Sequence, residues 1–262
     1  MEDEPHMKKT ALVTGGATGL GREVAIQLAE RGVTVAVADI TEGELHGTLE
    51  RMSGAPGTHL AIPLDLTGDG APDRVIDQCC AQWGQLDLLV NNAAYGAIEP
   101  FFESTHELWH RTLAINVTAV ALLTAAAGRE MLKRRSGRIV NLTSPAARMA
   151  LPNYAAYAAS KAAVDSITRA SAVALGPHGV LVNSVSPGMM DTEMQRSTEA
   201  RLAELENRVD LDQFLEERTR RVPLGRRAEI AEVAAVVLWL LLDAPSYITA
   251  ARLNASGGLD KD

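Results

Sequence analysis

The hydrophobic and polar positions of this chain follow two periods that alternate from one end to the other. Unbroken runs of Val, Ile, Leu and Ala are typical of strands buried on both faces, whereas apolar positions at helical spacing are typical of helices with one buried face. The unbroken runs predict strands at 10–16, 33–39, 59–65, 86–93, 137–144, 180–188 and 251–255. The helical spacing predicts helices at 20–31, 42–52, 73–83, 106–132, 154–175 and 229–242.

Strands that alternate with helices favour a parallel sheet, because a parallel pair needs a crossover connection and a helix usually supplies it. No Pro/Gly-rich linker, change of composition or internal repeat divides the chain. We therefore expect one α/β domain over 1–262, a doubly wound Rossmann-type sheet of about seven parallel strands with helices on both faces. We expect residues 1–8 to form a flexible N-terminus. For the charged segment 188–222 two interpretations stay open: it covers the substrate, or it forms a solvated helical hairpin with no substrate contact beyond its first turn.

Composition narrows the range of partners. The chain has 262 residues, is 47% apolar and carries a formal net charge of −8, which argues against nucleic acid or an anionic membrane as a partner. The N-terminus has no apolar signal segment, and the longest apolar run, 230–242, is interrupted by Glu232. The only two cysteines, Cys79 and Cys80, are neighbours and do not make a disulfide framework. These features indicate a reduced, cytoplasmic protein.

A glycine-rich segment, "TGGATGLG" from Thr14 to Gly21, joins the first expected strand to the first expected helix. Gly15 permits a tight turn, Gly19 lets a pyrophosphate approach the backbone, and Gly21 lets the helix pack close to the strand. The N-terminus of the helix then presents free N–H groups to phosphate. Glycine triplets are common in flexible turns, but this position at the first strand–helix junction predicts a dinucleotide site.

Asp39 ends the second expected strand. A carboxylate there accepts hydrogen bonds from the adenosine ribose hydroxyls and repels a 2′-phosphate. Because no Arg or Lys follows it closely, we expect NAD in preference to NADP. The alternative role for Asp39 is to cap the following helix.

Four polar residues in apolar surroundings are candidates for the chemistry. Tyr157 and Lys161 stand at i and i+4 in "YAASK", hence on one helix face, and a nearby ammonium lowers the pKa of a phenol. Such a pair alone is more often a surface pair than a site. Ser144, however, follows an expected strand at the edge where catalytic groups of doubly wound folds gather. Asn116 interrupts an apolar helix, where a buried amide needs partners and could hold a water against Lys161.

In their order and spacing these motifs resemble the short-chain dehydrogenase/reductase family over essentially the whole chain. The matching segments are "TGGATGLG", Asp39, "LDL" at Asp65, "NNAA" from Asn91, "INV" with Asn116, "LTS" ending at Ser144, "YAAYAASK" and "SPGMMDT". The resemblance implies the strand order 3-2-1-4-5-6-7 and hydride transfer between nicotinamide and a carbinol carbon. It implies four catalytic residues with Tyr157 as the general acid/base: Asn116, Ser144, Tyr157 and Lys161.

The resemblance also implies how the cofactor is held. Asp65 and Leu66 would touch the adenine, and Asn92 would lie at the adenosine-side ribose. Lys161 would bind the nicotinamide ribose, and Thr192 would meet the nicotinamide carboxamide. The full expected set is Thr14, Gly15, Thr18, Gly19, Leu20, Gly21, Asp39, Ile40, Asp65, Leu66, Asn92, Ala93, Tyr157, Lys161, Pro187, Gly188 and Thr192.

Several positions depart from the pattern of this family. Ala94 stands where a glycine is common, and Pro145 follows the expected catalytic serine. Ala250 and Ser256 stand where the family often has glycine and aspartate. None of these departures removes a catalytic group, so they bear on the shape of the pocket and on the C-terminal contacts.

The stretch "HELWH", His106–His110, matches H-E-x-x-H, a pattern that binds zinc through two histidines on one helix face. A zinc site also needs a third protein ligand, and no His stands at the metzincin spacing past His110. Glu130 does stand at a spacing that some zinc peptidases use. We favour a solvated pair of histidines at the start of the helix that carries Asn116, and we expect no metal.

The expected substrate pocket is lined by Tyr95, Ala146, Met149, Tyr154, Met189, Met190 and Met194. This mixture suits a small or medium secondary alcohol or ketone, cyclic or with an apolar arm. The alternatives are a 3-oxoacyl-carrier-protein-type reductase that uses NADPH and a non-catalytic nucleotide sensor on the same fold. Arg129 fits the carrier-protein alternative, but Val173 stands where a second arginine would be expected. Helix 154–175 is apolar on more than one face, and the resemblance implies a homotetramer or a homodimer.

Overall fold

The computed structural model describes residues 9–96 and 98–260, and the expectation for residues 1–8 lies outside them. Its strands form one parallel sheet in the order β3-β2-β1-β4-β5-β6-β7, which confirms the expected topology. The strands are β1 Thr10–Thr14, β2 Thr34–Asp39, β3 Leu60–Pro63, β4 Leu88–Asn91, β5 Gly137–Leu142, β6 Val180–Pro187 and β7 Arg252–Ala255.

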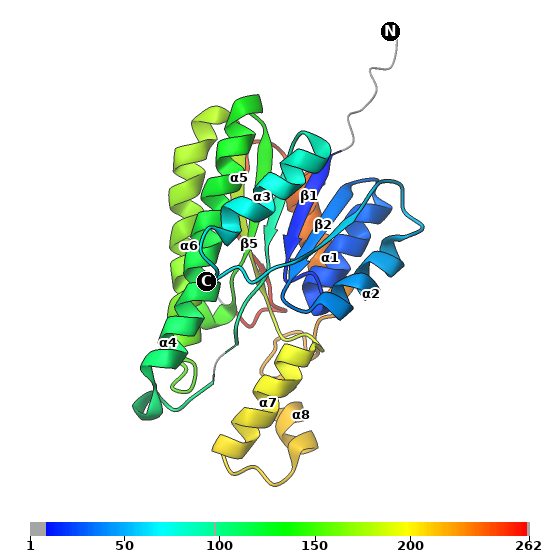
Figure 1. Cartoon of the computed structure of the whole chain (residues 1–262). Helices are drawn as coiled ribbons and strands as arrows, with labels where there is room; N and C mark the ends of the chain where they lie inside the picture. Colours follow the sequence, from blue (N-terminus) through cyan, green and yellow to red (C-terminus); the bar gives the residue numbers. More distant parts are fainter. Residues whose placement is uncertain (1–8, 97, 261–262) are drawn as a thin grey trace.

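Helices cover both faces of the sheet (Figure 1). One face is covered by α1 (Gly19–Glu30), α2 (Glu42–Met52) and α9 (Ile230–Leu238). The other is covered by α3 (Ala71–Trp83), α5 (Val120–Arg134) and α6 (Ala155–Leu175). Successive side chains of a strand point to opposite faces, so Ala11 and Val13 join the first layer while Leu12 joins the second. This two-sided burial explains why the strands read as unbroken apolar runs.

The helix expected at 106–132 is a composite of three parts. It begins as α4 (His106–Leu113), passes through a π-helical turn (Ala114–Ala119) and continues as α5. π-Turns are rare and cluster at functional sites, and this one contains Asn116. Apolar periodicity continues across the turn, which is why the sequence predicts one helix.

The expected covering segment 188–222 contains a helical hairpin of α7 (Glu193–Leu205) and α8 (Leu211–Arg220). The hairpin projects beyond the edge at which the strands end (Figure 1). Leu202, Ala203 and Phe214 form a small buried core of its own, against which Ile98 and Tyr154 pack. The hairpin is therefore joined to the rest of the protein through a residue of the expected substrate pocket.

The composite helix His106–Arg134 is, within the described residues, the one segment long and apolar enough to cross a membrane by length and composition alone. The sequence had led us to expect no such segment, because charged residues interrupt the longest apolar run. Half of its most apolar window is buried inside the protein. A core helix of a soluble protein passes the same test, and the contacts of α5 with the sheet are of that kind.

Candidate active site

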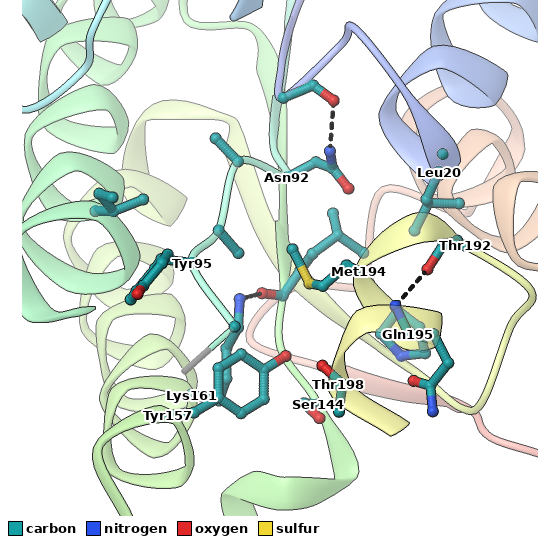
Figure 2. Close-up of a pocket in the computed structure, with 18 of the residues that line it drawn as sticks. Leu20, Asn92, Tyr95, Ser144, Tyr157, Lys161, Thr192, Met194, Gln195 and Thr198 are labelled. Carbon is teal, nitrogen blue, oxygen red and sulfur yellow. Dashed lines mark hydrogen bonds between the residues drawn. The ribbon is translucent and has the colours of Figure 1, made fainter. Parts of the chain in front are cut away.

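A cavity of about 730 Å³ lies at the edge where the strands end, between the sheet and α7. It extends from the glycine loop to the helical hairpin, and Figure 2 shows residues of both ends pointing into it. The expected cofactor residues that line it are Gly15, Thr18, Gly19, Leu20, Asp39, Ile40, Asp65, Leu66, Asn92, Ala93, Tyr157, Lys161, Pro187, Gly188 and Thr192. All seven expected substrate residues line it as well, namely Tyr95, Ala146, Met149, Tyr154, Met189, Met190 and Met194.

The glycine loop fits a dinucleotide for reasons of space. A Cβ on Gly21 would lie 2.0 Å from the Gly15 carbonyl oxygen, so a side chain there would push α1 away from β1. A Cβ on Gly15 would lie 2.8 Å from the Ala93 Cα, and Gly15 has a φ of +64°. Helix α1 has no side-chain cap from Thr18 and no acidic residue in its first turn. Its free N–H groups therefore open onto the cavity, the arrangement that binds phosphate.

Two backbone N–H groups hold the Asp39 carboxylate. Its Oδ2 accepts a hydrogen bond from the Ala17 N–H at 3.3 Å, and its Oδ1 accepts one from the Thr41 N–H at 3.1 Å. These bonds fix the carboxylate between the glycine loop and the start of α2. Each oxygen retains a lone pair, and the side chain lines the cavity. The residues present therefore fit a ribose diol at this position.

Ser144, Tyr157 and Lys161 converge at the centre of the cavity (Figure 2). Ser144 lies two residues past the end of β5 and hydrogen-bonds the Tyr157 hydroxyl. The Lys161 Nζ lies 5.7 Å from the centroid of the Tyr157 ring and donates to the Leu142 carbonyl oxygen at 2.9 Å. One turn of α6 and the end of β5 thus bring together three groups that the sequence placed in two separate motifs.

The pKa values of this group correct one expectation. Burial raises the pKa of Tyr157, and the hydrogen bond from Ser144 opposes this only in part. Burial also lowers the pKa of Lys161 to about 8, against the influence of the Asp165 carboxylate, which raises it. The lowering of the Tyr157 pKa by Lys161 is not found, because the amine is directed at the Leu142 carbonyl and burial disfavours both charges.

Three expected residues do not line the cavity. Asn116 is completely buried, and its amide donates to the Tyr95 carbonyl and to Ser160 Oγ, both at 3.0 Å. Both of its N–H groups are already engaged, so the expectation that this amide holds a water against Lys161 stays a prediction that depends on its oxygen alone. Thr14 donates to the Val90 carbonyl oxygen and accepts from the Asn92 N–H, so it joins β1 to β4. Gly21 acts through close packing alone.

The substrate end has polar residues that sequence reasoning missed. They are Arg111, Glu193, Gln195, Thr198, Arg218 and Arg221. Gln195 and Thr198 of α7 stand three residues apart, as do Arg218 of α8 and Arg221 just past it, and this helical spacing was the available signal. No motif marks them, because the two helices are charged on several faces.

The histidines of "HELWH" lie at the rim. His106 and His110 are exposed and stack with ring centroids 6.0 Å apart, and His110 borders the cavity. Within residues 9–96 and 98–260 no group of three or more His, Cys, Asp and Glu side chains is arranged to hold a metal ion. The third ligand that a zinc site requires is therefore missing from the described part of the chain.

Two of the departures from the expected pattern have structural consequences. Ala250 adopts a φ of +59°, a left-handed conformation that glycine adopts at lower cost. Ser256 is buried, and its hydroxyl accepts a hydrogen bond from the Asp260 N–H at 3.1 Å. The serine thus ties down the C-terminal segment at the position where an aspartate was expected.

Comparison with known proteins decides the family. A sequence model described as enoyl-(acyl carrier protein) reductase matches residues 15–260. The sorbitol dehydrogenase of Cereibacter sphaeroides is 34% identical over 251 residues, which is 95% of this chain and 96% of that protein. The chain belongs to the short-chain dehydrogenase/reductase family.

Solved structures of this family superpose closely. A xylitol dehydrogenase bound to NAD+ has a TM-score of 0.91 and 31% identity, covering 97% of this chain and all 100% of that one. An actinorhodin polyketide ketoreductase with NADPH has a TM-score of 0.92 and 31% identity, covering 97% and 98%. These names support alcohol–ketone oxidoreduction with a nicotinamide cofactor as the reaction class of the short-chain dehydrogenase/reductase described here.

Proposed function

We propose that this protein is an NAD(H)-dependent oxidoreductase that interconverts a secondary alcohol and a ketone, with Tyr157 as the general acid/base. The observation that carries the proposal is the shared cavity: the glycine loop and Asp39 line one end, and Ser144, Tyr157 and Lys161 line the middle. A dinucleotide that occupied the first end would extend toward the second. The remaining end is lined mainly by apolar side chains and is left for the substrate.

The bound nicotinamide would supply or accept the hydride at its C4. In the reduction of a ketone, Tyr157 donates its hydroxyl proton to the carbonyl oxygen, and Ser144 orients that oxygen by a hydrogen bond. In the oxidation of an alcohol, the Tyr157 phenolate removes the hydroxyl proton. Lys161 would hold the nicotinamide ribose. Asn116 contributes by fixing the backbone of Tyr95 at the cavity wall.

The pH dependence of the reaction follows from the protonation state of Tyr157, because ketone reduction requires the phenol and alcohol oxidation requires the phenolate. Because burial raises the pKa of Tyr157, the phenol keeps its proton at neutral pH and is ready to act as an acid. Ketone reduction is therefore favoured at neutral pH, and alcohol oxidation accelerates as the pH rises. Above a pH of about 8 Lys161 loses its charge, which would weaken its contact with the nicotinamide ribose and thereby slow reduction.

The test is a screen of NAD+ reduction, followed by absorbance at 340 nm, over secondary alcohols, sugar alcohols, hydroxysteroids and hydroxyacyl thioesters. Tyr157→Phe should lower kcat about a hundredfold to ten-thousandfold, the range of general acid–base catalysis. Tyr247→Phe is the matched control, because Tyr247 is exposed and remote from the cavity. If Tyr157→Phe retained full activity, the assigned mechanism would be refuted. NAD+ binding without any turnover would favour a nucleotide sensor instead.

The preference for NAD rests on Asp39, whose carboxylate faces the cavity between two N–H donors. Its negative charge repels a 2′-phosphate, so kcat/KM with NAD+ should exceed that with NADP+. Asp39→Asn keeps the side-chain size and removes the charge. It should therefore narrow the difference in kcat/KM between NAD+ and NADP+. Equal catalytic efficiency of the unaltered protein with both cofactors would contradict the assignment.

A carrier-protein reductase is the weaker alternative. Arg129, its expected docking residue, forms an ion pair with Asp73, and Val173 offers no charge nearby. For assembly, we infer a homotetramer, or a homodimer, that uses α5 and α6, since Leu122 and Val173 are exposed apolar residues of these helices. Size-exclusion chromatography with light scattering tests this. A cytoplasmic location, without membrane or nucleic-acid partners, remains part of the proposal.

A further inference from the structure

Two arginines share one buried glutamate in the helical hairpin. Glu199 of α7 is 1% exposed. Arg227 binds both of its oxygens, from Nη1 to Oε2 and from Nη2 to Oε1, each at 2.9 Å. This is a bidentate ion pair, in which two parallel hydrogen bonds join the guanidinium of Arg227 to the carboxylate of Glu199. The charge of Glu199 is thus balanced by Arg227 alone.

Arg218 is the second cation on this glutamate and is held by only one atom. Its Nε donates to Glu199 Oε1 at 3.2 Å, and its guanidinium carbon lies 5.6 Å from the centroid of the Phe214 ring. Among the described residues neither of its terminal nitrogens bonds a carboxylate. The side chain is 17% exposed and borders the cavity, with the Tyr154 hydroxyl as a hydrogen-bonding partner. Arg218 is therefore a largely buried cation at the substrate end, and it retains N–H groups beyond those that Glu199 and Tyr154 use.

The surroundings do not neutralise this charge. Arg221, one turn further along, also lines the cavity and forms no ion pair with a described residue. The lining acids Asp39 and Asp65 lie at the nucleotide end, which leaves Glu193 as the acid near the hairpin. Arg218 and Arg227 share the single charge of Glu199, so this largely buried group carries an unbalanced positive charge, which is costly. A ligand that brings an anion to this end would remove that cost.

Tyr154 connects the Arg218 end of the cavity with Tyr157. The rings of Tyr154 and Tyr157 are 6.4 Å apart between centroids, and the Tyr154 hydroxyl hydrogen-bonds Arg218. The apolar side chains of Ile98, Met149 and Met194 line the same cavity. Gln195 and Thr198 of α7 face this space as well (Figure 2). A substrate whose reacting group lies at Tyr157 can therefore present a second polar group to Tyr154 and Arg218.

We propose that the substrate is a secondary alcohol or ketone that carries a carboxylate, and that Arg218, assisted by Arg221 and Tyr154, binds this carboxylate. This inference rests on the proposed function for the reacting end of the substrate. The guanidinium N–H groups of Arg218 that Glu199 and Tyr154 do not use can donate charge-assisted hydrogen bonds to a carboxylate. Arg218 is then a specificity-determining residue, and Glu199 and Arg227 are positioning residues that hold it.

Binding of a pair of compounds that cannot react tests the proposal apart from any turnover. Cyclohexanecarboxylate and cyclohexanecarboxamide have the same shape and differ in charge, and their affinities are measured by calorimetry with NAD+ present. The unaltered protein should prefer the carboxylate. Arg218→Gln should weaken binding of the carboxylate about tenfold to a hundredfold, which is the contribution of a charge-assisted hydrogen bond. The affinity for the amide should not change. High salt should weaken binding of the carboxylate and leave binding of the amide unchanged.

Arg220→Gln is the matched control, since Arg220 lies on the same helix, pairs with the exposed Glu216 and does not border the cavity. It should leave both affinities unchanged. Arg218→Lys keeps the charge and loses the planar fork, so it should retain part of the preference. Thermal unfolding verifies that each variant is folded. If Arg218→Gln does not fold, Arg221→Gln supplies a second variant.

Turnover adds a second readout, with 3-hydroxycyclohexanecarboxylate and its amide as substrates. Arg218→Gln should raise KM for the acid and leave kcat nearly unchanged, because the contact is the same in the ground and transition states. Three results would overturn the proposal: no preference for the carboxylate in the unaltered protein, equal weakening of acid and amide, or an equal effect of Arg220→Gln. Binding of the carboxylate without any turnover of the hydroxy acid would instead count against the proposed function alone.

Discussion

Two buried ion networks lie in different parts of the molecule, and they have opposite imbalances of charge. On the hairpin, Arg218 and Arg227 share the one carboxylate of Glu199. Behind the catalytic strands, the one guanidinium of Arg252 is shared by Asp260 at 2.5 Å and Asp165 at 3.4 Å. The first network has an excess of positive charge, and the second has an excess of negative charge.

The difference shows that buried ion pairs serve separate purposes in one site. Arg252 Nη2 donates to the Ser144 carbonyl oxygen and to Ser186 Oγ, both at 3.0 Å, and thereby ties the ends of β5 and β6 to β7. Its surplus acid, Asp165, faces Lys161 and raises the pKa of that amine. The rear network therefore supports the catalytic groups, while the surplus cation of the hairpin network faces the substrate space.

Removal of the shared arginine at the rear should have the largest effect. Arg252→Met leaves Asp165 and Asp260 buried without their cation, and breaking such a pair costs about 3–5 kcal/mol. We expect a loss of that size in the free energy of unfolding, measured by urea denaturation, and a loss of activity because Ser144 is no longer held. The midpoint of unfolding and kcat should fall together.

The corresponding change on the hairpin, Arg227→Met, tests whether the imbalance of charge affects stability. Arg227→Met leaves Glu199 with Arg218 as its remaining cation, so the network becomes balanced instead of unpaired. Its cost in stability should therefore be smaller than that of Arg252→Met. Equal losses in the two variants would show that the imbalance of charge has no bearing on stability.

Loss of the hairpin carboxylate should have the next largest effect. Glu199→Gln leaves Arg218 and Arg227 as neighbouring cations with no anion between them, which favours opening of α7 and α8. We expect KM to rise about tenfold or more for acidic and neutral substrates alike, because Arg218 and the cavity wall lose their position. Limited proteolysis should cut the hairpin sooner, while urea unfolding of the rest changes little. A selective effect on acidic substrates would contradict this role.

The sequence predicted the nucleotide end of the site and missed both networks. The glycine loop and Asp39 are local motifs, in which the spacing itself sets the geometry. Arg227 and Glu199 are 28 residues apart, and Arg252 is 108 residues from the Ser144 carbonyl that it binds. Charged residues at such separations read as a solvated surface until the fold brings them together.

The chemistry at the centre was predicted in its residues and not in its electrostatics. The i and i+4 spacing of Tyr157 and Lys161 shows that they share a helix face, but not that burial acts on both pKa values. Asn116 was expected to hold a water, yet its amide is used by the Tyr95 backbone, a partner that no periodicity reveals. The strand order followed from the family resemblance, since it is a property of the whole fold.

A change at Asp165 should have a moderate effect that is visible in the pH profile. Asp165→Asn removes the anion that raises the Lys161 pKa, so this pKa should fall below its value of about 8. The charged form of Lys161 is then lost at a lower pH, and the alkaline decline of kcat/KM for ketone reduction should move to lower pH. Arg252 keeps Asp260 as its partner, so the fold is retained. An unchanged pH profile would show that the rear network does not influence the pKa of Lys161.

The smallest effect is expected from an ion pair that belongs to neither network. Glu216 and Arg220 lie at i and i+4 on α8 and are both largely exposed, with Nη2 and Oε2 2.9 Å apart. Exposed helical pairs contribute about 0.3–0.5 kcal/mol, because water screens the charges and two long side chains lose freedom. Glu216→Gln should therefore shift the urea midpoint only slightly, and the shift should vanish at high salt, whereas the loss from Arg252→Met should persist there. If salt abolished both losses equally, burial would not distinguish the rear network from an ordinary surface pair.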